Sequence, residues 1–301
     1  MYNHRTGRGL LTQVQGKGPP GNIIIGRSDA AHSLRQMVAL AAGSNAPLLI
    51  TGPAGSGKTV TARAVHAASA KRNGPFIRAD CSGLGSDAMM TLFGIGRDGI
   101  APKLQRKSYL QMARGGSILF NEIADLPRDL QAVLQQILSG KPVPGLPIEP
   151  HQYGQIRIIA STRQALGHLI GEDQFRQDLY YSLSLLSIPV PPLRHRRTDI
   201  LTLIEYFLMP QSETKRFTLD REALQLLGTH FWPGNIRELR NLVARACHFY
   251  PGAIIGPQQI GALLRMGDPA TSHATPARPR HAETDHTWGR MSLPCPDPGC
   301  R

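Results

Sequence analysis

The chain has 301 residues, of which 41% are apolar and 18% are charged, and its lysines and arginines exceed its acidic residues to give a formal net charge of +13. This composition excludes a disordered or fibrous chain and leaves room for one large domain or two moderate ones. No apolar run approaches the length of a membrane span, and residues 1–21 lack the apolar stretch of a secretory signal, so we expect a cytoplasmic protein without a membrane partner.

Regular structure is predicted to begin near Ile23, after a glycine- and proline-rich arm that covers residues 1–22. Apolar residues at helical spacing predict a helix over residues 33–42, and the apolar run that follows predicts a strand over residues 48–51. A further helix is predicted over residues 60–70. The segment between this strand and this helix is a phosphate-binding loop.

The loop reads Gly52, Pro53, Ala54, Gly55, Ser56, Gly57, Lys58 and Thr59, which is a complete GxxxxGK(S/T) motif. Its glycines allow backbone N–H groups to turn toward phosphates, Lys58 is expected to reach the β- and γ-phosphates, and the Thr59 hydroxyl is expected to bind Mg²⁺. The strand and helix that flank the motif make a chance match improbable. The loop therefore predicts a nucleoside triphosphate and Mg²⁺ as ligands.

Strands and helices continue to alternate after the loop. Strands are predicted over residues 75–79, 115–122 and 156–161, and helices over residues 87–93 and around an apolar face that begins at Leu130. Several of the strands are apolar almost throughout, which favours a parallel sheet with helices on both faces. The expected fold class is α/β.

The pattern changes at residue 197, beyond which only helices are predicted, over residues 199–208, 220–230, 235–250 and 257–266. We therefore expect a nucleotide-binding domain at residues 23–196, a smaller all-helical domain at 197–266 and a disordered tail at 267–301. Cys81 and Cys247 lie in apolar segments and are expected to be buried thiols. Cys295 and Cys300, in the tail, form a poor metal or redox pair, and their role stays open.

Eight motifs in a fixed order resemble one known family. They are Pro75–Cys81, Leu92–Gly94, Gly115–Glu122, Leu126–Gln131, Ile156–Thr162, Phe175–Tyr181, Pro191–Arg194 and Trp232–Leu239. Together they are similar to the AAA+ domain of sigma-54-dependent transcriptional activators, over about residues 23–266. The resemblance implies a P-loop AAA+ parallel sheet with a helical lid, assembly into a ring, and ATP hydrolysis that remodels sigma-54 RNA polymerase.

The resemblance also implies roles for single residues. Glu122 would polarise the attacking water, Arg176 would act as an arginine finger on the neighbouring subunit's nucleotide, and Arg237 would be the sensor II arginine. Thr162 ends the sensor strand. Two other interpretations remain: Glu122 as a helix-capping carboxylate and Arg237 as a surface cation.

Four positions depart from the family pattern. Asn121 replaces the aspartate that holds the metal, so it would bind Mg²⁺ only weakly and through water. Asp80 stands where an asparagine is usual, Arg163 follows Thr162 in place of an asparagine, and Ser182 replaces a second arginine. Asp80 could supply the missing carboxylate to the metal, or it could simply raise a carboxyl pKa and damage the site.

The segments that contact sigma-54 and DNA in this family differ here as well. The loop at residues 95–107 is basic and lacks the GAFTGA motif that touches sigma-54, and no helix-turn-helix is expected after Met266. Contact with RNA polymerase sigma-54 is therefore doubtful, and an acidic or nucleic-acid contact for the basic loop is an alternative to a solvated surface. Two functions remain open. One is an ATP-binding regulator in a ring, or in a mixed ring with a related activator, and the other is a hydrolysis-deficient regulatory subunit that engages neither sigma-54 nor DNA.

Overall fold

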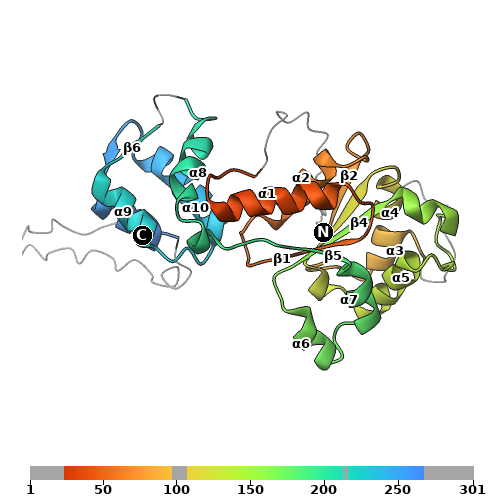
Figure 1. Cartoon of the computed structure of the whole chain (residues 1–301). Coiled ribbons are helices and arrows are strands. Elements are labelled where there is room, and N and C mark those ends of the chain that lie inside the picture. Colours follow the sequence, from red (N-terminus) through yellow and green to blue (C-terminus); the bar gives the residue numbers. More distant parts are fainter. Residues whose placement is uncertain (1–23, 97–106, 213, 215, 268–301) are drawn as a thin grey trace, which may run out of the picture.

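The computed structural model describes residues 24–96, 107–212, 214 and 216–267. Figure 1 shows two bodies, a sheet layered between helices and a cluster of helices, with helix α1 (Asp29–Ala42) running from one toward the other. Within the described residues, no helix is long and apolar enough to cross a membrane. The expected basic loop at 95–107, the arm, and the tail with Cys295 and Cys300 lie wholly or mostly outside the described residues.

The central sheet has five parallel strands in the order β2-β3-β4-β1-β5. The strands are β1 (Leu48–Thr51), β2 (Phe76–Asp80), β3 (Ser117–Asn121), β4 (Arg157–Thr162) and β5 (Leu186–Pro189). All five strands run the same way, so their carboxyl ends meet at one edge of the sheet, where ligands bind in open α/β sheets. The α/β fold expected from the alternating pattern is confirmed.

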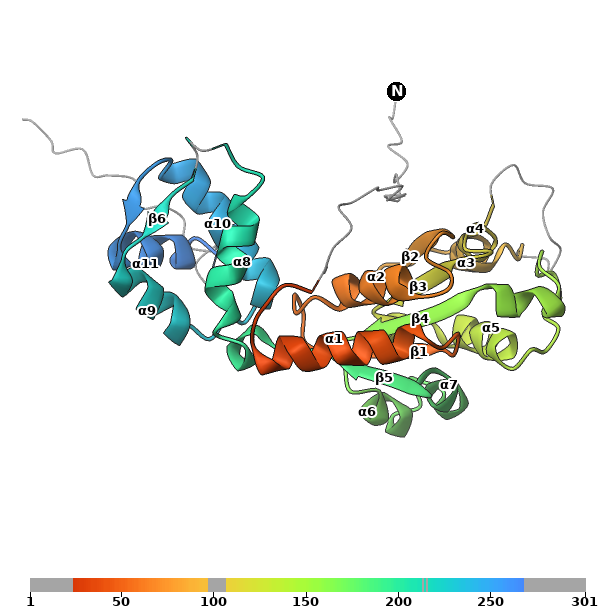
Figure 2. The same cartoon turned by 45° about the horizontal axis from the view of Figure 1, so that its top comes forward.

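Alternate residues of the strands belong to two separate apolar cores. In β3, Leu119 packs with α1 and α2 (Lys58–Ala68), whereas Ile118 and Phe120 pack with the helices on the other face. The helices of that other face are α3 (Ala88–Phe93), α4 (Tyr109–Met112), α5 (Arg128–Leu138), α6 (Leu166–Gly171) and α7 (Gln177–Leu183). Figure 2 shows α1 and α2 along one side of the sheet. The period of two explains why these strands are apolar throughout.

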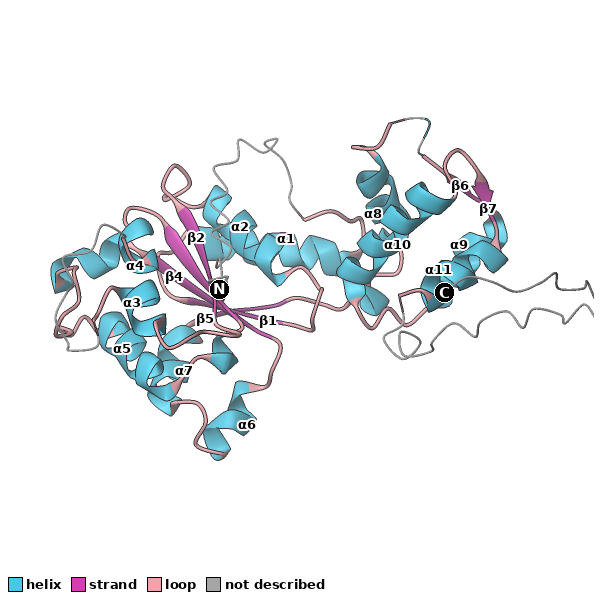
Figure 3. Cartoon of the chain, turned by 180° about the vertical axis from the view of Figure 1, so that it is seen from behind, coloured by secondary structure: helices cyan, strands magenta, loops and turns pink. Residues whose placement is uncertain are grey.

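A third core holds the C-terminal helices together around the buried Trp232. These helices are α8 (Asp199–Leu208), α9 (Arg221–Thr229), α10 (Asn235–Phe249) and α11 (Pro257–Arg265). The region also contains a short parallel ladder of β6 (Thr218–Leu219) and β7 (Ile254–Ile255), visible in Figure 3, which the helical pattern did not predict. Two-residue strands are too short to give a periodic signal.

Two polar contacts that the sequence did not predict join α1 to the sheet and the residues before α1 to α8. The guanidinium of Arg157 is fully buried at the start of β4, and its Nη2 donates to the Ala41 carbonyl at 2.6 Å, at the C-terminal end of α1. The buried Asp199 accepts hydrogen bonds from the backbone N–H of Arg27 at 2.6 Å and from the backbone N–H of Ser28 at 2.8 Å. Asp199 therefore fixes the start of α1 against α8.

Candidate functional site

The phosphate-binding loop connects β1 to α2 at the carboxyl edge of the sheet. Gly52, Gly55 and Gly57 have φ values of 150°, 73° and 108°, a range that side-chain-bearing residues rarely adopt. The Lys58 side chain folds back over the loop, and its Nζ donates to the carbonyls of Gly52 at 2.9 Å and Pro53 at 3.3 Å. The helix begins at Lys58, two residues earlier than the apolar pattern predicted, because Gly57 serves as its N-cap.

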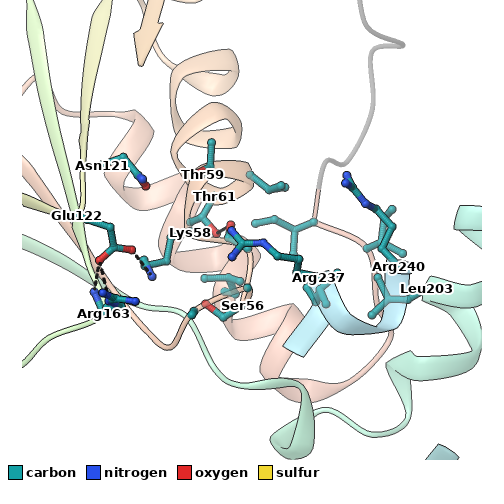
Figure 4. Close-up of a pocket in the computed structure, with 18 of the residues that line it drawn as sticks. Ser56, Lys58, Thr59, Thr61, Asn121, Glu122, Arg163, Leu203, Arg237 and Arg240 are labelled. Atoms are coloured by element: carbon teal, nitrogen blue, oxygen red, sulfur yellow. Dashed lines mark hydrogen bonds and ion pairs between the residues drawn. The ribbon is translucent and has the colours of Figure 1, made fainter. Parts of the chain in front are cut away.

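A cavity of about 840 Å³ opens in front of this loop and receives residues from both bodies (Figure 4). Ala54–Thr61 form its floor, and the ends of β2, β3 and β4 contribute Asp80, Asn121, Glu122 and Arg163. Six cationic side chains and two acidic ones line it; the cationic residues are Lys58, Arg78, Arg163, Arg196, Arg237 and Arg240. An excess of fixed positive charge suits a polyanion such as a triphosphate.

Glu122 lies between two of these cations. Its Oε1 is 3.1 Å from the Lys58 Nζ, its Oε2 accepts the Arg163 backbone N–H at 3.0 Å, and the Arg163 guanidinium Nε is 4.0 Å from Oε2. Figure 4 shows these three side chains together. Glu122 has the left-handed backbone φ of 56° and makes no capping hydrogen bond, so the capping interpretation fails. An uncommon backbone conformation at such a residue is typical of functional sites.

Asn121 is almost fully buried, and its amide is engaged at both ends. Its Nδ2 donates to Asp80 Oδ1 at 3.1 Å, and its Oδ1 accepts from the Ser161 hydroxyl at 3.0 Å. The other Asp80 oxygen pairs with Arg78 Nη2 at 2.7 Å. The structure therefore brings Asp80 and Asn121 together at the cavity wall, on neighbouring strands.

The remaining expected site residues fall into two groups. Thr59 and Arg237 line the cavity, whereas Gly52, Pro53, Thr162 and Arg176 do not. The Thr162 hydroxyl donates to the Gln164 carbonyl at 3.2 Å, and it is the next residue, Arg163, that lines the cavity. Arg176 is the N-cap residue directly before α7 and forms a two-pronged pair with Asp178, whose pKa this pairing lowers. Arg176 therefore has no role in the cavity of its own chain.

Sequence reasoning missed the apolar end of the cavity and three of its arginines, Arg78, Arg196 and Arg240. Ile24 and Ile25 precede α1, whereas Leu203, Tyr206 and Phe207 lie on α8, and together they offer a surface for a flat apolar group. Arg196 is buried beneath the loop, where its Nη2 donates to the Ser56 carbonyl at 2.8 Å. Burial lowers the Arg196 pKa, and the nearby Asp199 carboxylate opposes this shift. The apolar residues and Arg196 belong to no short motif.

The helical region touches the phosphate-binding loop directly. The buried Asn235 donates from Nδ2 to the Ala54 carbonyl at 2.9 Å and accepts from the Leu193 N–H at 2.8 Å, while the Ile236 N–H donates to the Gly55 carbonyl at 3.0 Å. A Cβ atom on Gly55 would lie 2.2 Å from the Gly234 carbonyl oxygen. The approach of the two bodies therefore requires glycine at position 55.

Comparisons with known proteins agree with this arrangement. A family model described as the sigma-54 interaction domain matches residues 24–189, and one described as the AAA+ ATPase lid domain matches residues 194–277. The chain is 36% identical to the nitrogen assimilation regulatory protein NtrX of Azorhizobium caulinodans over 81% of its own length and 56% of the relative's. It is 34% identical to the DNA-binding transcriptional regulator NtrC of Rhizobium meliloti over 83% of its own length and 52% of the relative's.

Among solved structures, NtrX from Brucella abortus in complex with ATP aligns with a TM-score of 0.67 and 33% identity, over 79% of this chain and 55% of that one. The chain thus spans about half the length of the curated relatives it matches.

Proposed function

Because the chain belongs to the AAA+ family that carries the sigma-54 interaction domain and its lid, we propose that it binds ATP in the cavity described above and acts as a transcriptional regulator of the sigma-54 interaction type. The observation that carries the proposal is the convergence of Lys58, Glu122 and Arg237 on one cavity in front of a glycine-rich loop. The three residues come from α2, the end of β3 and α10, so only the folded chain joins them.

In this proposal the triphosphate lies along residues 52–59, with Lys58 on the β- and γ-phosphates and Arg237 reaching down from the helical region. The adenine then fits the apolar end formed by Ile25, Leu203 and Phe207. Glu122 holds the attacking water and accepts its proton. In the structure Glu122 is paired with Lys58, so the phosphates would compete with it for this lysine.

The donor set fits Mg²⁺ only in part. The Thr59 hydroxyl is a suitable oxygen ligand, and when bound the cation neutralises charge on the phosphates. Asn121 offers no charge, and its nearly buried amide oxygen already accepts one hydrogen bond, from Ser161. Mg²⁺ would accordingly be held by Thr59, by the nucleotide itself and by water.

Assembly and partner belong to the same proposal. Arg176 lies outside its own cavity, and its side chain is about one-third exposed, which supports an action on the nucleotide of a neighbouring subunit. We infer a ring of this chain, or a mixed ring with a related activator, in the cytoplasm, with sigma-54 RNA polymerase as a less favoured partner. Residues 23–196 and 197–266 would be its two working domains, as the separate apolar cores suggest.

A second function is favoured by the engaged amide of Asn121: a subunit that binds nucleotide without hydrolysing it and regulates by switching assembly. The two functions separate in a phosphate-release assay on the purified chain, with Lys58→Ala as the control that removes triphosphate contacts. Steady release that Lys58→Ala abolishes establishes the ATPase and contradicts the inactive subunit. Retention of ATP in equilibrium binding without release favours the inactive subunit, and failure to bind ATP contradicts both.

A further inference from the structure

The ends of β2 and β3 carry an aspartate and an asparagine that face each other in register. Asp80 and Asn121 are direct partners in the parallel ladder, and Asn121 Nδ2 donates to Asp80 Oδ1 at 3.1 Å. The Asn121 oxygen accepts from Ser161 on the next strand at 3.0 Å. Because both ends of the amide are bonded to protein, the orientation of Asn121 is fixed, and it presents its N–H group to Asp80.

The two residues differ in what they offer to the cavity. Asn121 is nearly buried, carries no charge and already accepts from Ser161 on its amide oxygen, whereas the Asp80 side chain is 50% exposed and lines the same cavity as Thr59. A carboxylate has about four acceptor positions on its two oxygens. Asn121 and Arg78 use two of these positions. Asp80 can still accept hydrogen bonds from groups in the cavity.

We propose that Asp80 supplies, from β2, the acidic function for a hydrated divalent cation bound to a nucleoside triphosphate, and that Asn121 is the residue that positions it. The inference rests on the proposed binding of ATP. Mg²⁺ gives up its water reluctantly and usually keeps several water molecules when it binds with phosphates. A carboxylate one strand away can therefore act through those waters.

The other acidic side chain of the cavity is already paired with a lysine. Among the described residues that line it, Asp80 and Glu122 are the only acidic side chains, and Glu122 is held by Lys58 at 3.1 Å and by Arg163. Asp80 is the acidic group with open acceptor positions on the β2 side. Its pairing with Arg78 also keeps the carboxylate at the wall, since both side chains line the cavity.

The test measures how much Mg²⁺ strengthens ATP binding, as the ratio of the ATP dissociation constants in EDTA and in excess Mg²⁺. Asp80→Asn should lower this ratio about tenfold, the loss typical of removing a group that acts on a metal through its ligands. Its affinity in EDTA should not fall, because no contact with the phosphates themselves is removed. The exchange Asp80→Asn with Asn121→Asp should restore the ratio by moving the carboxylate to β3.

Asp125→Asn is the matched control. Asp125 accepts from Ser82 at 2.7 Å and from Gln164 at 2.9 Å, close to the site, but it does not line the cavity. This variant should keep the parental ratio. Urea unfolding of each variant shows that it folds, and electron paramagnetic resonance of Mn²⁺ with ATP reports the cation directly: the bound fraction should fall in Asp80→Asn and return in the exchange variant.

An unchanged ratio in folded Asp80→Asn overturns the inference while leaving ATP binding intact. Equal losses of affinity in EDTA and in Mg²⁺ overturn it as well, since they would mean a structural role. If the parent chain binds no ATP with or without the cation, the proposed function fails and the inference fails with it.

Discussion

Lys58 Nζ lies 3.1 Å from Glu122 Oε1, so the lysine of the phosphate-binding loop is paired with the proposed catalytic carboxylate. Both side chains are largely buried, with 6% and 16% exposure, so water screens the pair little. A triphosphate that binds this lysine would compete with the glutamate for it.

Glu122→Gln should therefore strengthen ATP binding. The substitution removes a competitor for Lys58 and a negative charge beside the phosphates, and we expect a gain on the order of 1 kcal/mol, or about fivefold. Equilibrium titration with ATP measures it, with Asp125→Asn as the control for loss of a nearby carboxylate that does not line the cavity. Weaker binding by a folded Glu122→Gln would show that the pair organises the loop rather than competing for it.

Arg163→Asn should reduce the preference for ATP over ADP. The Arg163 guanidinium lines the cavity and is 4.0 Å from the carboxylate that Lys58 also holds, which places it near the expected γ-phosphate. The side chain is 55% exposed, so we expect a loss of roughly fivefold for ATP and little change for ADP. Arg163→Lys keeps the charge and should retain most of the preference. Equal losses for both nucleotides would contradict the assignment.

Asn235→Ala should destabilise the contact between the helical region and the loop by about 2–4 kcal/mol, because it removes two buried hydrogen bonds and leaves the Leu193 N–H without its acceptor. Asn235 also has a positive φ of 52°. Asn235→Gly lacks the side chain but accepts this φ, so it should be less destabilised than Asn235→Ala by roughly 1 kcal/mol. Urea unfolding measures both, and equal stabilities of parent and variants would contradict the prediction.

The stability of the fold should fall on acidification through His66. Burial lowers the pKa of this histidine, a hydrogen bond with Gly74 opposes the shift, and the positive charge of Arg157 adds to it. The neutral ring is therefore favoured in the folded state, where Nδ1 is 2.9 Å from the Ser117 hydroxyl. Its contribution is complete above the ordinary histidine pKa of about 6.5 and declines as the pH falls toward the lowered folded value.

The measurement is the free energy of unfolding against pH for the parent and for His66→Gln, which keeps a polar side chain without a titrating ring. The difference between the two curves should shrink as the pH falls. A constant difference would mean that His66 does not titrate differently in the two states. Other histidines contribute equally to both curves and cancel.

The sequence predicted those parts of the site that short motifs encode. The phosphate-binding loop, Glu122 at the end of a buried strand and the alternating elements all follow from local pattern. Arg196 and the pair Ile24 and Ile25 could not be predicted, because they reach the cavity only through packing between distant segments. The sequence analysis expects Thr162 at the site, whereas in the structure its hydroxyl bonds to Gln164 and the next residue, Arg163, lines the cavity.

The environment of Arg157 in the core could not be predicted either. In the sequence Arg157 only interrupts an otherwise apolar strand, whereas in the fold its guanidinium is fully buried and bonded to the last turn of α1. A helix C-terminus carries partial negative charge and unpaired carbonyls, so it can receive a cation without a carboxylate nearby. That partner is 116 positions away, beyond the reach of any local pattern.

Asn235 joins the helical region to the loop through the backbone carbonyl of Ala54. This hydrogen bond is made to the main chain of the loop and not to a side chain, and the Ile236 N–H likewise donates to the Gly55 carbonyl. A rotation of those two peptide groups would change the hydrogen bonds that position the start of α10, whatever side chain stands at position 54. The contact between the helical region and the loop thus depends on backbone geometry, and substitutions at position 54 that keep this geometry should preserve it.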